Sequence, residues 1–261
     1  SKIYTSLEGG GLAIRMSDDF GQTWSEEKTV YVGACWEPSL LEAENGEIYL
    51  FFTATGPSLY LYGEENINLR SSGVGMIRST DNGESWTPDV KGPPYRPQYV
   101  MRQYTHTFEN GVRHYTDQMP VAVQLNNGTI IIGVESGFDG EKRHYFSICY
   151  NNDGFAEDVG MDKTGPADRQ SNIFSLAAPY LMQFPSGEVV LTNAGAYRFG
   201  DCTARSFFEP VQLFSRDTLI SGAAGSIECL SSHSAAYSSA LNTGEIEVVR
   251  LYLNHRLNAK K

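Results

Sequence analysis

Three acidic residues occupy positions from which two carboxyl groups could act on one substrate. Glu135 follows a predicted strand, and Glu37 and Asp117 each come just before one. Hydrolysis of a glycosidic bond usually needs two carboxyl groups, one as acid and one as nucleophile or base. Their surroundings must also push their pKa values apart. We therefore take Glu135, Glu37 and Asp117 as candidate catalytic residues and ask which elements position them.

A repeated hairpin supplies those elements. In three places a proline and a glycine are separated by eight positions, with an apolar run after the glycine: Pro38 to Gly46, Pro120 to Gly128 and Pro179 to Gly187. A fourth copy, Ala236 to Gly244, keeps the spacing without the proline. Each copy predicts a strand, a tight turn and a second strand.

The repeat makes Glu135 unusual. It is the seventh residue after Gly128, and the matching positions hold the neutral residues Thr53, Ala194 and Leu251. One carboxylate among neutral counterparts favours a functional role. The alternative is an exposed loop glutamate after a strand.

Glu37 and Asp117 have structural alternatives as well. Glu37 follows Trp36, whose ring could stack on a sugar, but a glutamate at a strand start can also be a supporting residue. Asp117 and Gln118 come just before an inner strand, where an aspartate often bonds the turn instead.

A second repeat runs out of phase with the first. Ser17–Trp24 and Ser79–Trp86 share the pattern S-x-D-x-G-x-(S/T)-W, and Asn151–Phe155 is a degenerate copy in which Phe155 takes the place of the tryptophan. The aspartate is expected to bond backbone N–H groups, the glycine to take a positive φ, and the tryptophan to bury its ring under the turn. We call these segments the aspartate turns and expect them to be structural, on the outer hairpins.

Together the two repeats give units of four strands. In one unit, Gly73–Arg78 is the third strand and leads into an aspartate turn. Radial repetition of such sheets is the propeller pattern. We predict an all-β fold, a β-propeller of four-stranded antiparallel blades forming one domain over residues 1–261, with long insertions at 54–70, 91–115 and 156–175.

The two ends of the pattern are irregular. No proline-to-glycine hairpin precedes Ser17, and no aspartate turn follows Gly244. Either the C-terminal hairpin joins the N-terminal strands in one shared blade, or an N-terminal hairpin of a longer form is missing.

From Leu12 to about Arg250 the chain resembles the aspartate-box (BNR-repeat) propellers of the sialidase superfamily. The order Trp36–Pro38, Met119–Val123, Ala178–Tyr180 is most similar to exo-arabinanase-like glycoside hydrolases. The resemblance implies five to six blades, six in most family members, and a carbohydrate substrate. It also places Glu135 at the position of the acid/base carboxylate.

One departure from that pattern matters. The resemblance implies a nucleophilic carboxylate after the second strand of the Pro179 unit, but Thr192–Arg198 holds no acid. A sialidase-type site would instead use a tyrosine nucleophile, for which Tyr197 and Tyr237 are candidates, and arginines that hold a carboxylate. The arginine that normally opens such a propeller is absent from this chain. The available arginines, for which solvated loop positions are the alternative, are Arg102, Arg113, Arg143, Arg198 and Arg205.

Further residues are candidates for contact with a substrate. Four tyrosines could stack on sugars or pack under loops: Tyr60, Tyr62, Tyr104 and Tyr115. His106, His114 and His144 lack a recognised metal-ligand spacing, so we expect no metal and no cofactor. The predicted substrate-binding residues are Trp36, Gln118, Arg113, His114, Arg143, Tyr197 and His233.

Charge and composition limit the partners. With 20 basic and 31 acidic residues the formal charge is −11, which argues against nucleic acid. No apolar run is long enough to span a membrane. The four cysteines lack a C-x-x-C pair, and we favour free thiols over a Cys202–Cys229 disulfide.

We therefore expect a monomer that is secreted or periplasmic, otherwise cytoplasmic. It would hydrolyse terminal glycosidic bonds of a glycan; the alternative is a non-catalytic carbohydrate-binding or interaction propeller.

Overall fold

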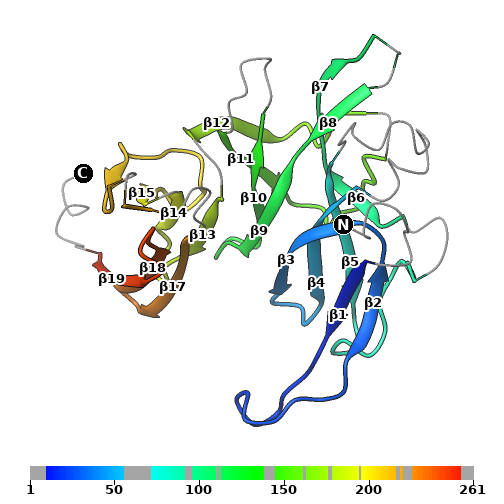
Figure 1. The fold of residues 1–261 in the computed structure, drawn as a ribbon, viewed down its shortest axis with the longest axis horizontal. Coiled ribbons are helices and arrows are strands. Elements are labelled where there is room, and N and C mark those ends of the chain that lie inside the picture. Colours follow the sequence, from blue (N-terminus) through cyan, green and yellow to red (C-terminus); the bar gives the residue numbers. More distant parts are fainter. Residues whose placement is uncertain are drawn as a thin grey trace. The chain divides into compact units, whose positions relative to one another are not determined.

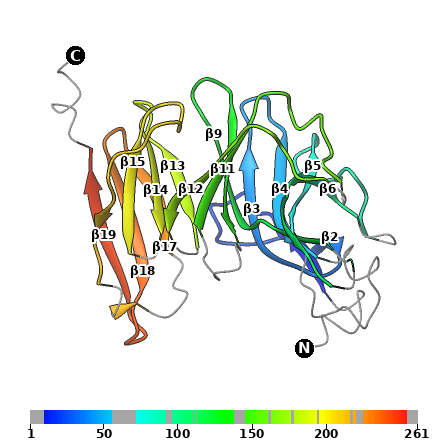
Figure 2. The same cartoon turned by 90° about the horizontal axis from the view of Figure 1, so that it is seen from above.

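The computed structural model of the chain is an all-β protein (Figures 1 and 2). There is no α-helix in the described part of the chain, which confirms the predicted class, and none of its segments is a helix able to span a membrane. The described residues are 10–55, 72–91, 96–109, 111, 113–137, 145–160, 163–175, 178–193, 195–215, 218–219 and 225–253.

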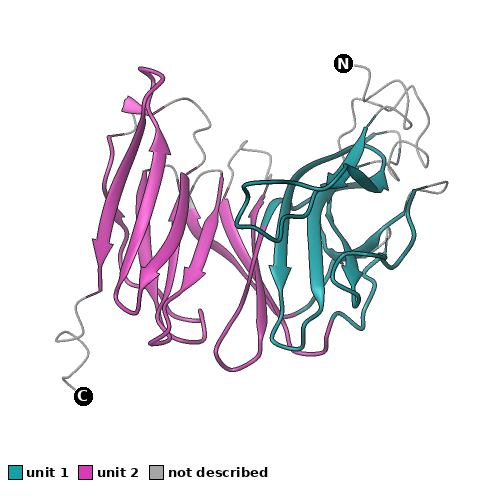
Figure 3. Cartoon of the chain, turned by 90° about the horizontal axis from the view of Figure 1, so that it is seen from below, with its two compact units in different colours: residues 1–120, 155–167 teal, residues 121–154, 168–261 magenta. Residues whose placement is uncertain are grey.

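The chain divides into two compact units (Figure 3). Unit 1 comprises residues 1–120 and 155–167, and unit 2 comprises residues 121–154 and 168–261. Each unit is described by itself below, and the single-domain expectation stays a prediction.

Unit 1 contains one complete four-stranded antiparallel sheet. Its first hairpin turns at Gly46, which has a φ of 81°, and the third strand leads into the second aspartate turn, both as predicted. The strands, in their order across the sheet, are β3 (Cys35–Glu42), β4 (Ile48–Ala54), β5 (Val74–Ser79) and β6 (Gln98–Met101). Unit 1 also holds the hairpins β1 (Gly11–Ile14) with β2 (Lys28–Val32) and β7 (Gln103–Thr107) with β8 (Arg113–Thr116).

Two further four-stranded sheets follow. The first begins with the last residues of unit 1 and continues in unit 2; its strands are β9 (Gln118–Gln124), β10 (Ile130–Ser136), β11 (Tyr145–Asn151) and β12 (Arg169–Ser175). The second lies in unit 2; its strands are β13 (Tyr180–Gln183), β14 (Val189–Asn193), β15 (Ala196–Gly200) and β16 (Val211–Gln212). The predicted insertions at 91–115 and 156–175 therefore contain strands β6 to β8 and β12.

The last sheet corrects one assignment. The Ala236–Gly244 hairpin was predicted to supply the first two strands of a unit, but it supplies the second and third. Its strand β18 (Ser234–Ala240) pairs on one side with β17 (Gly225–Ser231) and on the other with β19 (Ile246–Tyr252). The sequence of β17 gave little signal because it mixes glycine, serine and a glutamate with its apolar residues.

The shared-blade interpretation of the chain ends stays a prediction. Among the described strands, β1 pairs with β2 in unit 1, and β17, β18 and β19 pair among themselves in unit 2.

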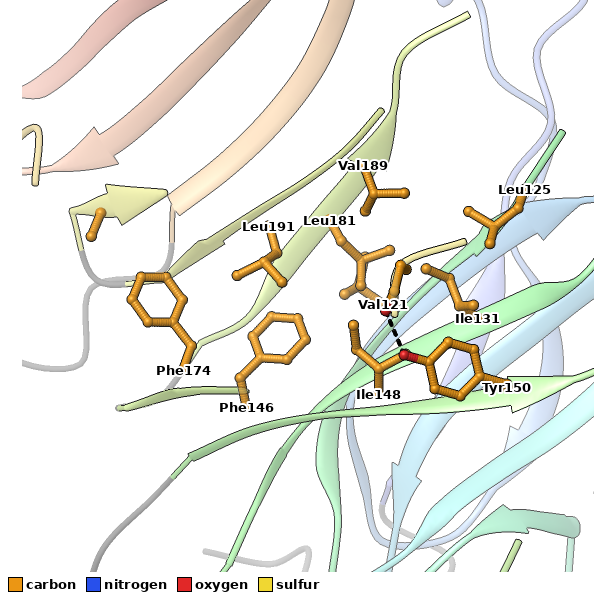
Figure 4. Packing of buried hydrophobic residues seen from close by; sticks show 12 residues of the cluster. Val121, Leu125, Ile131, Phe146, Ile148, Tyr150, Phe174, Leu181, Val189 and Leu191 are labelled. Atoms are coloured by element: carbon orange, nitrogen blue, oxygen red, sulfur yellow. Dashed lines mark hydrogen bonds between the residues drawn. The ribbon is translucent and has the colours of Figure 1, made fainter. Parts of the chain in front are cut away.

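Apolar strand residues form the cores of both units. In unit 1, Tyr31, Phe52, Ile77 and Tyr99 are fully buried in one cluster. In unit 2, Figure 4 shows side chains of β9, β10, β11, β13 and β14 packed together, with the Tyr150 hydroxyl donating to the Ala204 carbonyl at 2.5 Å. Every residue of β10 is buried, which explains its almost continuous apolar sequence.

The aspartate turns have the predicted hydrogen bonds. Asp81 Oδ1 accepts from the Ser85 N–H at 2.8 Å and from the Ser79 hydroxyl at 2.8 Å. Asp19 makes the equivalent bonds with Thr23 and Ser17. The hydroxyl of Ser85 donates to Asp81 Oδ2 at 2.5 Å, and that of Thr23 donates to Asp19 Oδ2 at 2.6 Å. These hydroxyl groups have the largest effect, and together with the other donors they lower the pKa of both carboxyl groups to about 2.

The tryptophans are less buried than predicted. The indole N–H groups of Trp24 and Trp86 each donate to the turn glycine carbonyl at 3.1 Å. However, Trp24 remains 59% exposed, and Trp86 is half-buried. Phe155 of the degenerate turn is well buried, with its ring centroid 5.4 Å from those of Tyr49 and Phe51.

All four cysteines are free thiols. Burial raises the pKa of Cys35 to about 12, so this thiol is not a ready nucleophile.

Replacing Asp81 with alanine is expected to lower the melting temperature by a few degrees at neutral pH, since the turn donors lose their acceptor. The folded-state pKa lies below the ordinary 3.8, so this stabilisation is present above about pH 4 and is lost as the pH falls toward 2. Thermal unfolding at pH 7 and pH 3 measures the difference.

Asp18→Ala is the control, because it removes an exposed carboxylate at a variable position of the first aspartate turn. Equal effects of the two substitutions at both pH values would contradict a specific role for the Asp81 bonds.

Candidate functional site

The candidate site of unit 1 begins at a bulge in β3. Trp36 pairs with Thr53, but the next paired residue, Ser39, lies opposite Phe51. Two residues of β3, Glu37 and Pro38, therefore lie opposite a single residue of β4, and Glu37 has a φ of 52°. The bulge turns the Glu37 side chain out of the regular strand pattern, and the residue is exposed.

Two donors hold the Glu37 carboxylate. Its Oε2 accepts from the Thr53 hydroxyl at 2.9 Å and from the Met119 N–H at 3.2 Å. Thr53 is 1% exposed, so an exposed acid is fixed by a buried hydroxyl.

Asp117 belongs to the same neighbourhood. It lies between β8 and β9, two residues before Met119, and its side chain is fully buried. Its φ of 99° and that of Met119, 54°, show how sharply the chain turns before the inner strand β9. The structure therefore brings Glu37 together with the segment Asp117–Met119, which includes the half-buried Gln118, and places the half-buried Trp36 beside Glu37.

Glu135 lies in unit 2, near the end of β10. It is 4% exposed, so the alternative of an exposed loop glutamate is wrong. Its Oε2 accepts from the Ala178 N–H at 3.2 Å, and Ala178 has a φ of 60°. The carboxylate thus fastens the chain just before Pro179.

The hairpin β7–β8 carries the predicted residues Arg113 and His114 in unit 1. The Thr105 hydroxyl lies 3.0 Å from Nδ1 of His106 and 2.9 Å from Nδ1 of His114. It also donates to the His114 carbonyl at 3.2 Å. Since one hydroxyl has one proton, at least one of these imidazoles carries its proton on Nδ1.

The tyrosines of this hairpin differ in exposure. Tyr104 is 43% exposed and available to a ligand, whereas Tyr115 is buried. The predicted Arg143, together with His144, Tyr60 and Tyr62, lies outside the described residues.

The other arginines serve the fold. Arg102 is fully buried, with its guanidinium carbon 4.0 Å from the Tyr115 ring centroid and its Nη1 donating to the Gly160 carbonyl. Arg205 forms two bonds of 2.7 Å to Asp168, and Arg198 donates to the Phe208 carbonyl. The solvated loop positions expected for Arg102 and Arg198 are therefore wrong, because the sequence does not show their partners. Arg205 lies in an exposed loop, as expected, and pairs there with Asp168.

The candidate tyrosine nucleophiles also have structural surroundings. Tyr237 is fully buried, and its hydroxyl accepts from the Gly195 N–H at 3.0 Å. Burial raises the pKa of this phenol, which makes it a poor nucleophile. Tyr197 is half-buried against Phe199, and the exposed His233 lies in the turn between β17 and β18.

Sequence analysis missed the importance of Thr53. It counts there only as a neutral counterpart of Glu135, although the matching position in the repeat was the available sign that the two residues share a structural role. Among the described residues no group of three or more His, Cys, Asp or Glu side chains could hold a metal ion.

No protein-family model matches the sequence, and no curated protein sequence matches it. Solved structures share its fold. The α-L-arabinanase of Penicillium chrysogenum, solved with arabinobiose, has a TM-score of 0.60 at 14% identity over 93% of this chain and 67% of that one. The α-L-arabinofuranosidase of Fusarium graminearum, also solved with arabinobiose, has a TM-score of 0.56 at 14% identity over 94% and 67%. The NanB sialidase of Streptococcus pneumoniae has a TM-score of 0.59 at 11% identity over 94% and 54%.

This chain is therefore similar in fold to propeller glycosidases, and its antiparallel sheets are the blades of a β-propeller fold, as predicted. It spans about two-thirds of the arabinose-specific enzymes and about half of the sialidase.

Tyr237→Phe is expected to lower the free energy of unfolding by about 1–3 kcal/mol, because the buried Gly195 N–H loses its acceptor. Any glycosidase activity should persist, since the phenol serves the fold. Denaturant unfolding and rate measurements on the same samples provide the check.

Tyr252→Phe, at a tyrosine that is 65% exposed, is the matched control. Unchanged stability together with lost activity in Tyr237→Phe would instead support a nucleophilic tyrosine.

Proposed function

We propose that this protein is a glycoside hydrolase-like propeller that cleaves terminal glycosidic bonds of a glycan, with exo-arabinanase-like or sialidase-like specificity. The observation that carries the proposal is the Glu37 carboxylate, exposed yet fixed by Thr53 and Met119 next to the buried Asp117. The similarity in fold to arabinose- and sialic-acid-specific enzymes supports the same class.

The carboxyl groups of unit 1 differ in ways that suit two roles. Glu37 is exposed and held as an acceptor at Oε2, an arrangement fit for a nucleophile or general base. Asp117 is fully buried, two residues before Met119, and we assign it the role of the partner acid. Glu135, in unit 2, keeps the acid/base role that the family resemblance implies as a further prediction.

The remaining predicted residues would bind the sugar. Trp36 offers an aromatic face beside Glu37, and Arg113 and His114 lie on the hairpin that runs directly into Asp117. Arg–hydroxyl and imidazole–hydroxyl bonds orient a sugar ring, while an aromatic face covers its C–H side. The other predicted binding residues are Gln118, Arg143, Tyr197 and His233.

One observation favours the alternative of a non-catalytic carbohydrate-binding propeller. Where the arabinanase resemblance implies a nucleophile, β14 ends in the buried, uncharged Thr192 and Asn193. A binding protein would need no acid there.

A panel of aryl α-L-arabinofuranosides and aryl sialosides separates the two functions. We expect the wild type to hydrolyse one class, and Glu37→Gln and Asp117→Asn each to lower kcat by about 10²–10⁴-fold. Glu135→Gln tests the third carboxylate in the same assay.

Glu42→Gln, an exposed glutamate on the same strand as Glu37, should leave the rate unchanged. No turnover of any arabinoside or sialoside by the wild type would exclude both named activities. Calorimetric binding of the same sugars without turnover would then support the alternative.

A further inference from the structure

Each described inner-strand proline is preceded by a residue in the left-handed region. Glu37, Met119 and Ala178 have φ values of 52°, 54° and 60° and come directly before Pro38, Pro120 and Pro179. This region is unfavourable for a residue that has a side chain, and a following proline restricts the residue further. Something in the surrounding structure must therefore hold these junctions.

Two of the junctions are held in the same way. The Met119 N–H donates to Thr53 Oγ1 at 2.9 Å in unit 1, and the Ala178 N–H donates to Glu135 Oε2 at 3.2 Å in unit 2. Thr53 and Glu135 are the seventh residues after the turn glycines Gly46 and Gly128. Both side chains are buried at the ends of second strands.

The two acceptors differ chemically. Glu135 brings a carboxylate to the N–H by itself. The Thr53 side chain of unit 1 is shorter than that of a glutamate, and its hydroxyl group has a proton that it must donate to an acceptor. Since the Met119 N–H can only donate, the hydroxyl proton goes to Glu37 Oε2, 2.9 Å away.

We infer that Thr53 is a positioning residue for Glu37. Its hydroxyl accepts from the Met119 backbone and donates to the Glu37 carboxylate, and so links the exposed acid to the segment that carries Asp117. Glu37 Oε2 also lies 3.2 Å from the Met119 nitrogen, so the three groups close a triangle of hydrogen bonds. This role rests on the proposed function for its effect on rate but not for its effect on the backbone.

The test compares Thr53→Val, which keeps the shape but lacks the hydroxyl, with Thr53→Ser, which keeps the hydroxyl but lacks the methyl group. In Thr53→Val we expect kcat to fall about 10-fold or more, because a small displacement of a reacting group is costly. KM should change less than about two-fold, because the sugar contacts remain. Thr53→Ser should stay within about three-fold of the wild type in both constants.

Hydrogen exchange of the Met119 amide, followed by NMR, gives a readout independent of activity. We expect exchange to speed up about 10-fold or more in Thr53→Val and to stay near the wild-type rate in Thr53→Ser. Thr192→Val is the matched control, because Thr192 is a buried threonine near the end of the corresponding strand whose Oγ1 has no hydrogen-bond partner in the described structure. It should alter neither readout.

The outcomes are distinct. Unchanged Met119 exchange and kcat in Thr53→Val would overturn the inference, as would equal losses in Thr53→Ser and Thr53→Val, since the methyl group would then matter rather than the hydroxyl. If the wild type turns over no glycoside, the proposed function fails, while the Met119 exchange rates still decide the role of Thr53. If Thr53→Val does not fold, the same comparison is made between Thr53→Ala and Thr53→Ser.

Discussion

The structure of the candidate site depends on residues whose backbone has a positive φ angle. Three residues before inner-strand prolines lie in the left-handed region, and strain of this kind costs on the order of 1–3 kcal/mol per residue. Buried acceptors at the ends of second strands hold two of these junctions. The same bonds place Glu37 against the Asp117–Met119 segment, so the geometry of the site follows from how the strained junctions are fastened.

The aspartate turns do a different job. Their hydrogen bonds are local, within eight residues; the first turn lies between β1 and β2, and the second follows β5, the third strand of the unit 1 sheet. Because those bonds depend on a few adjacent side chains, the turn is easy to identify in a sequence. It identifies the fold, while the candidate residues Glu37 and Asp117 lie in or just before strands β3 and β9, where long-range contacts decide their orientation.

Burial and hydrogen bonding show which candidate residues could contact a ligand and which support the fold. Glu135 and Asp117 are both buried, Glu37 is exposed, and Tyr237 gives its hydroxyl to a backbone N–H. Arg102, which resembled a loop charge, is among the largest fully buried side chains of the described residues and lies against two tyrosine rings. A carboxylate or guanidinium in sequence says nothing of its partners, and the partners decide whether it serves a ligand or the fold.

The sequence alone determined the all-β class, the hairpins at Gly46, Gly128 and Gly187, and the bonding of the aspartate turns. These features depend on alternation, turn glycines and side chains a few residues apart, all visible in one dimension. It also singled out Glu37, Asp117 and Glu135 by their places in the repeat. Only the tertiary structure decided that β17 precedes the last hairpin in its sheet, that Glu135 is buried, and that Thr53 joins Glu37 to Met119. Those facts rest on contacts between residues up to 82 positions apart, which neither local propensity nor periodicity encodes.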